Sequence, residues 1–218
     1  MVVTYLELVN SVLVRLRERE VSAVTENTYS KLVGEFVNDA KEEIENACDW
    51  SHLRTTLTAT TVADIFAYTL TSSGTRLKVL NVVNDTSNEF MTYKSAEEFT
   101  DLYLNYATVD TGIPRYYSFN GLDANNDTIA EVYPKPDGQY ELRFNLVVRP
   151  GPLVNNSDLL YAPERPVILL AYAKALEERG EDGGITPTGA YVTANRMLND
   201  AISFDQEKHS EELVFRAI

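Results

Sequence analysis

The sequence predicts an α+β protein in which N- and C-terminal helices form a helical core and an antiparallel β-sheet elaboration is inserted between them. Apolar residues recur at helical spacing near both ends of the chain. In the middle, apolar and polar residues alternate with a period of two, as in half-buried strands rich in β-branched and aromatic residues. Because the two patterns are segregated rather than interleaved, separate helical and sheet parts are favoured.

Residues 1–50 are expected to supply two helices of the core. Thr4 and Glu7 have the spacing of a capping box, in which each side chain binds a free N–H group of the first turn. The apolar stripe that follows consists of Tyr5, Leu6, Val9, Val12, Leu13 and Leu16. A second stripe runs from Ser30 to Cys48. Trp50, the only tryptophan, is expected to have a structural role at the end of that helix.

The β elaboration is expected over residues 53–93 and 112–150, with a short helix near residues 96–106 between its two parts. Residues 128–149 predict a β-hairpin around the turn Lys135-Pro136-Asp137-Gly138. Proline fixes φ there, aspartate can bind the backbone, and glycine accepts a positive φ. Beyond the turn the alternation is uninterrupted, and one face carries Tyr140, Leu142, Phe144, Leu146 and Val148.

Residues 160–204 are expected to complete the helical core. Pro163 suits the first turn of one helix and Gly180 suits its end, while Pro187 opens a final helix. Residues 205–218 are expected to form a C-terminal tail. We interpret all these parts as one domain of 218 residues.

The charge balance excludes several classes of protein. Nineteen basic and 33 acidic residues give a formal net charge of −14. A surface that coats DNA or RNA needs clustered lysine and arginine, and so does a basic membrane-surface protein. No stretch is long and apolar enough for a membrane span, so no membrane partner is expected. The single cysteine, Cys48, cannot form an intrachain disulfide.

The sequence predicts no catalytic, cofactor-binding or metal-binding site, and therefore no enzyme and no cofactor. His52 follows a helix end, His209 lies in a charged tail, and Cys48 lies on an apolar helix face. Asp123, Asn125 and Asp127 have the spacing that opens a calcium-binding loop, but the later positions of that motif do not match, so a polar turn is favoured. Four tyrosines on expected strands leave a carbohydrate-binding face as a minor alternative: Tyr116, Tyr117, Tyr133 and Tyr140.

Residues 112–176 resemble a pattern found in tailed-phage head-to-tail adaptor, or connector, proteins of the podovirus type. The resemblance lies in Gly112-Ile113-Pro114, Tyr117, the run from Tyr133 to Leu142, Arg149-Pro150-Gly151-Pro152-Leu153, Asp158, and the run from Pro163 to Leu170, which leads into a helix with Ala171, Ala173 and Ala175. The N-terminal half is similar in layout, with two helices, a tryptophan and threonine-rich strands.

This resemblance implies a structural virion protein of the neck or tail, made in the host cytoplasm. It implies a ring, usually of twelve copies, in which helices build the wall and DNA passes through the channel only as cargo. The implied partners are the portal protein, tail nozzle or tail-tube proteins, and further copies of the chain. The alternatives are another neck or tail component and, as a weaker one, a carbohydrate-binding tail module.

The C-terminal end is the expected partner-binding segment. It combines acidic residues with Phe204, Leu213, Val214 and Phe215, and we expect it to dock on a neighbouring copy or on the portal. The acidic balance also suits a conduit, because each phosphate that a protein neutralises adds affinity for DNA.

Overall fold

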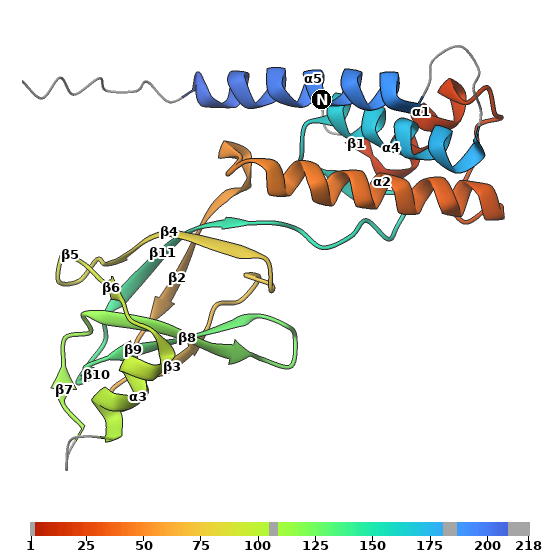
Figure 1. Ribbon diagram of the computed structural model, residues 1–218. Helices are drawn as coiled ribbons and strands as arrows, with labels where there is room; N and C mark the ends of the chain where they lie inside the picture. Colours follow the sequence, from red (N-terminus) through yellow and green to blue (C-terminus); the bar gives the residue numbers. More distant parts are fainter. Residues whose placement is uncertain (1–2, 105–108, 181–186, 209–218) are drawn as a thin grey trace, which may run out of the picture. The chain divides into compact units, whose positions relative to one another are not determined.

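A computed structural model describes residues 3–104, 109–180 and 187–208 of the chain (Figure 1). The protein is of the mixed α+β class, as predicted. The chain divides into two compact units, which are described separately below. A helical unit is built from residues 1–52 and 152–218, and a sheet unit is built from residues 53–151.

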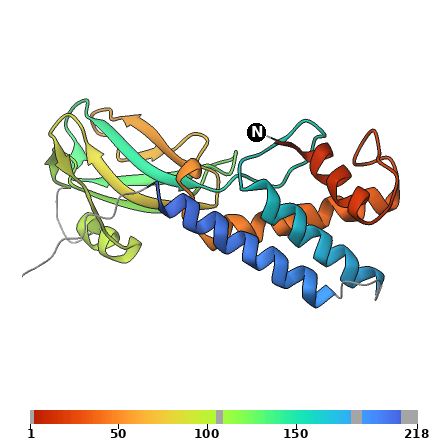
Figure 2. The same cartoon turned by 90° about the horizontal axis from the view of Figure 1, so that it is seen from above.

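In its described residues, the helical unit contains four helices and one short pair of strands. The helices are α1 (Tyr5–Arg15), α2 (Thr28–Ala47), α4 (Glu164–Arg179) and α5 (Pro187–Gln206). Strand β1 (Val3–Thr4) pairs antiparallel with β12 (Leu159–Leu160). Helix α4 packs against each of the other three helices, and Figure 2 shows it side by side with α5. Its buried residues surround the helix axis, as expected for a helix enclosed on all sides.

The starts of α1 and α2 are fixed by capping boxes. The Thr4 N–H donates to Oε2 of Glu7 at 2.8 Å, and the Glu7 N–H donates to Oγ1 of Thr4 at 3.3 Å, which confirms the predicted capping box. Asn27 and Ser30 form a second capping box at the start of α2. The sequence indicated Ser30 only as the start of an apolar stripe, because asparagine–serine is a less familiar capping pair than threonine–glutamate.

The sheet unit begins at Leu53, the last residue of the short helix η1 (Ser51–Leu53), and its described residues contain two four-stranded sheets. One sheet has the order β2 (Arg54–Thr60), β11 (Glu141–Val148), β4 (Leu77–Asn84), β5 (Glu89–Phe90). The other has the order β3 (Ala67–Thr69), β9 (Thr128–Tyr133), β8 (Tyr116–Leu122), β6 (Thr92–Tyr93). Helix α3 (Ala96–Leu104) lies between β6 and β7 (Thr111–Gly112) in sequence, and β10 (Lys135–Pro136) pairs with β7.

The two sheets share one hydrophobic core and form a two-layer sandwich. Leu142, Phe144 and Leu146 come from the first sheet, and Ala130 and Val132 come from the second. All five side chains are at most 1% exposed. Most pairings are antiparallel, as expected, but β6 pairs parallel with β8 and β10 pairs parallel with β7.

The predicted hairpin over residues 128–149 is wrong. Strands β9 and β11 do not pair with each other but lie in different sheets, and they meet only through their core-facing side chains. Residues 135–136 form β10, which pairs with β7, so the segment between β9 and β11 connects two layers. Alternation shows which face of a strand is buried, and that face is the same for two strands of a hairpin and for two strands stacked across a sandwich.

We expect Gly34→Ala to destabilise the protein by about 1–3 kcal/mol, although alanine is the better helix former. A Cβ atom at Gly34 would collide with the Tyr5 hydroxyl and would lie 2.9 Å from Cγ1 of Val24. Tyr5 is only 4% exposed, so the clash would disturb the packing of a buried side chain. Urea denaturation measures the loss.

The control for this prediction is Tyr5→Phe, alone and combined with Gly34→Ala. Removal of the hydroxyl takes away the nearest clash, so the two losses should sum to more than the loss in the double variant. Strict additivity, or a stabilising Gly34→Ala, would contradict the proposed close approach.

Candidate functional site

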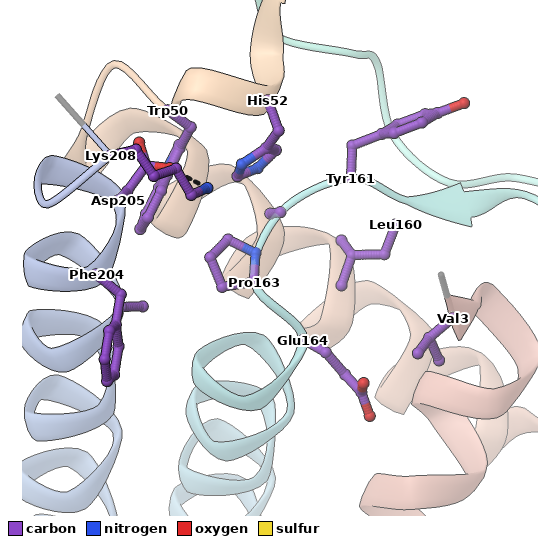
Figure 3. A pocket seen from close by; sticks show the side chains of 12 residues that line it. Val3, Trp50, His52, Leu160, Tyr161, Pro163, Glu164, Phe204, Asp205 and Lys208 are labelled. Atoms are coloured by element: carbon purple, nitrogen blue, oxygen red, sulfur yellow. Dashed lines mark hydrogen bonds and ion pairs between the residues drawn. The ribbon is translucent and has the colours of Figure 1, made fainter. Parts of the chain in front are cut away.

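A groove of about 440 Å³ lies in the helical unit and is the candidate site (Figure 3). It is bounded by the end of α5, by η1 and by the connection from β12 into α4. The residues that line it are Val3, Trp50, His52, Leu160, Tyr161, Ala162, Pro163, Glu164, Ala201, Phe204, Asp205 and Lys208. We call it the helix-end groove. The residues that line the helix-end groove thus come from chain segments that are distant in sequence.

Asp205 ties the end of α5 to η1. Its carboxylate accepts hydrogen bonds from the Ser51 N–H at 2.8 Å and the Ser51 hydroxyl at 2.6 Å. The ammonium group of Lys208 lies 2.9 Å from the same carboxylate. Burial alone would raise the pKa of Asp205, but the hydrogen bonds from Ser51 and Lys208 outweigh it and lower this pKa to about 2. The charged carboxylate thus fixes one wall of the groove.

Trp50 and His52 line the groove beside this connection. The Trp50 indole N–H donates to the carbonyl oxygen of Ile44 at 2.8 Å, and the side chain is 1% exposed. The ring centroids of Trp50 and His52 are 5.7 Å apart. Partial burial lowers the pKa of His52, against a raising effect of Asp205. Trp50 therefore has the structural role at the helix end that its position predicts.

The polar groups of the groove hold the structure together rather than forming a catalytic pair. In the described part of the chain, the Ser51 hydroxyl is engaged by Asp205 and Lys208 and not by His52. A serine nucleophile needs a base within hydrogen-bond distance, which His52 does not provide here. The arrangement fits a binding surface better than a reaction centre.

Two large apolar side chains are exposed at this groove. Phe204 on α5 is 69% exposed and Tyr161 before α4 is 54% exposed. Figure 3 shows them on opposite sides of the groove. Exposed aromatic side chains beside a hollow are typical of surfaces that bind a partner, where they supply much of the binding energy.

Of the four residues expected to bind a partner, the structure places Phe204 at the groove. Leu213, Val214 and Phe215 lie outside the described residues. Helix α5 ends at Gln206, so the first positions of the expected tail are helical. The sequence did not indicate Asp205, because its partner Ser51 lies 154 residues away. Tyr161 could have been found in the sequence, because it ends the apolar run Leu159-Leu160-Tyr161.

Two other features of the sequence, the turn at Asp123 and the tyrosines Tyr117 and Tyr133, have structural roles. Asp123 Oδ1 accepts the N–H groups of Asn125 and Asp127, which makes the polar turn that we interpreted. Within the described ranges there is no group of three or more potential metal ligands, and no helix there is long and apolar enough to span a membrane. Tyr117 and Tyr133 are buried and contact other rings, with Tyr117 and Phe144 centroids 6.3 Å apart.

Comparison with known protein families shows the class of the protein. The family model described as SU10 adaptor protein matches residues 3–212, a range that spans both structural units. The chain belongs to the SU10 adaptor protein family. This family membership confirms the resemblance to phage head-to-tail adaptors that the sequence indicated. No match was found among curated proteins.

Membership in the SU10 adaptor family has direct consequences for the coarse function. A structural adaptor family implies a bacteriophage virion component without enzymatic activity, which interacts with phage portal and tail components. The helix-end groove of this SU10 adaptor protein is accordingly a candidate contact surface.

We expect Asp205→Asn to cost about 1–3 kcal/mol of unfolding free energy at neutral pH, because the charged hydrogen bonds to Ser51 and Lys208 are weakened. The folded-state pKa is about 2 and lies below the unfolded value of about 3.9. The contribution is therefore complete above pH ~4 and disappears as the pH falls toward 2. Chemical denaturation of both proteins across this range measures it.

The matched control is Asp200→Asn, an exposed carboxylate on the same helix. It should leave the stability within about 0.5 kcal/mol of the wild type at each pH. An Asp205→Asn penalty that does not shrink in acid would contradict the assignment of the stabilising role to the ionised carboxylate.

Proposed function

We propose that this SU10 adaptor protein forms a ring, of twelve copies, between the portal vertex of a phage head and the tail. DNA passes through the ring as cargo. The observation that carries the proposal is the family match over residues 3–212, because it spans the helical and the sheet units together. A ring of identical subunits needs two different complementary faces on each copy, and a four-helix unit with an inserted sandwich provides several.

The two units suggest a division of labour within a single adaptor domain. We assign residues 1–50 and 160–204 to a helical core that builds the ring wall. We assign residues 53–93 and 112–150 to the β elaboration that meets the tail nozzle or tail tube. Support for the wall comes from α4, whose enclosure by three helices makes a rigid block. A rigid block suits a ring that must keep its shape while DNA passes.

The charge distribution supports a conduit that releases DNA. Several of the few basic side chains are already paired with acidic ones within the chain. Nζ of Lys174 lies 2.6 Å from Glu43, and Arg179 lies 2.6 Å from Glu18. Basic groups that are neutralised internally bind phosphates less well, and the net charge is −14. Both effects lower the affinity of the protein for DNA.

The helix-end groove and the residues after it form our proposed portal-binding end. Phe204 is exposed at the groove, and Lys208, the last described residue, also lines it. Residues 209–218 then bring Leu213, Val214 and Phe215, which are apolar enough to bury against a partner. We therefore assign portal docking to these three residues together with Phe204.

Electron microscopy of the purified protein mixed with portal tests this proposal, and a ring that caps the portal is the expected result. Deletion of residues 209–218 should abolish capping while the circular dichroism spectrum stays unchanged. The deletion begins at residue 209 because Asp205 and Lys208 stabilise the end of α5.

A point variant separates the groove from the general surface. Phe204→Ala should weaken portal binding by about tenfold or more, as expected for an exposed aromatic residue that becomes buried in a complex. The matched control is Val192→Ala on the same helix, where the side chain is 65% exposed but does not line the groove. Equal effects of the two variants, or full capping by the truncated chain, would overturn the assignment.

A further inference from the structure

Strand β2 lies at the edge of its sheet with one side open. In the described part of the chain it pairs only with β11. The Thr61 N–H donates to the Tyr140 carbonyl at 2.9 Å, which fixes the alternation along the strand. The backbone groups of Thr55, Leu57 and Ala59 therefore point to β11. The backbone groups of the other four residues point to the open side. We call these residues the β2 edge: Arg54, Thr56, Thr58 and Thr60.

Apart from the charged Arg54 at its first position, the β2 edge lacks the devices that usually prevent edge strands from pairing with other chains. The sequence of strand β2, Arg-Thr-Thr-Leu-Thr-Ala-Thr, has no proline, lysine or glycine, and the register of β2 with β11 is uninterrupted. Five of its seven residues are exposed. On the other side of β11, β4 carries Lys78 and a register shift next to Leu146, and β5 covers its last two residues. Of the two sides of this sheet, the β2 side is therefore the one that can accept a further strand.

The β2 edge is complementary to a second copy of itself. In an antiparallel pairing centred on Leu57, Thr56 lies opposite Thr58 of the second copy, and Arg54 lies opposite Thr60 of the second copy. All four outward-pointing residues then form hydrogen-bonded pairs, with about eight backbone hydrogen bonds in total. The cross-strand threonine pairs are favourable, and no like charges face each other.

Charge complementarity also favours a second copy as the partner. On the outer face of the sheet, Glu141 of β11 lies directly beside Thr60. Arg54 of the second copy would then be two strands, or about 10 Å between Cα atoms, from Glu141. Two extended side chains can span that distance across a threonine. In the described part of the chain no ion pair engages either residue, so the pairing would create two new ones by symmetry.

We propose that two copies of this protein join through the β2 edges, antiparallel and centred on Leu57, into one continuous sheet. Such a contact is twofold and closes on two copies, whereas a cyclic ring needs a heterologous contact that repeats. The dimer is therefore a state of the protein outside the proposed ring, and it does not rest on the proposed function.

Sedimentation velocity of the full chain tests the proposal, and a concentration-dependent dimer is the expected result. Thr58→Pro should abolish it, because the ring blocks the edge and removes an outward N–H group. The fold should survive, since a proline is tolerated where the N–H group of an edge strand faces solvent. Thr58→Val, which keeps the N–H group, is the matched control and should still form the dimer.

Disulfide trapping tests the register in a Cys48→Ser background. In the proposed register, the two copies of residue 57 form a non-hydrogen-bonded pair with Cα atoms about 4.5 Å apart, which a disulfide can bridge. Leu57→Cys should therefore cross-link under oxidation. Ala59→Cys lies on the same face of the same strand, but its two copies would be about 14 Å apart, so it should not cross-link.

Four results would overturn the proposal. The first is a wild-type protein that is monomeric at all concentrations, and the second is a dimer that Thr58→Pro does not affect. The third is equal cross-linking of the two cysteine variants. The fourth is a Thr58→Pro variant that circular dichroism shows to be unfolded, together with a Leu57→Cys variant that is folded but does not cross-link. Portal capping by Thr58→Pro should equal that of the wild type. Loss of capping by a folded Thr58→Pro variant would be a fifth result against the proposal, because it would place the β2 edge in the ring.

Discussion

The enclosure of α4 is the constraint on which the helical unit depends. A helix with apolar residues around its whole circumference must be covered on every side, and α1, α2 and α5 provide that cover. Two of these helices come from the beginning of the chain and one from near its end. The chain ends must therefore be brought together, and everything between His52 and Pro152 becomes an insertion into the helical unit. The layout of the whole protein follows from burying this one helix.

Local patterns predicted the elements well, because their causes are local. The capping box of Thr4 and Glu7, the apolar stripes of α1 and α2, and the strands around Leu57 and Phe144 all depend on neighbours within a few residues. The mixed α+β class follows from the same patterns. The strand partners could not be predicted from local patterns. Whether β9 and β11 pair within one sheet or stack across two sheets depends on the entire sandwich.

The candidate site shows the same limit. Phe204 stood out in the sequence as an aromatic residue near an acidic end, and it is exposed at the groove. Asp205 did not stand out, because a carboxylate on a helix usually faces solvent. Its role depends on Ser51 in η1, which lies 154 residues away in the sequence. The β2 edge could be found only from the register, because seven residues of a strand do not show on which side their neighbour lies.

The discontinuity of the helical unit has a consequence for synthesis. The sheet unit is one continuous segment, so all its strands leave the ribosome before α4 does. The apolar faces of α1 and α2 must wait for about 120 further residues, or roughly 6–24 s at typical elongation rates, until α4 can cover them. The sandwich can thus mature first, while the helical half closes only as the last quarter of the chain emerges. Nascent chains of this protein carry exposed helical apolar surface for most of their time on the ribosome.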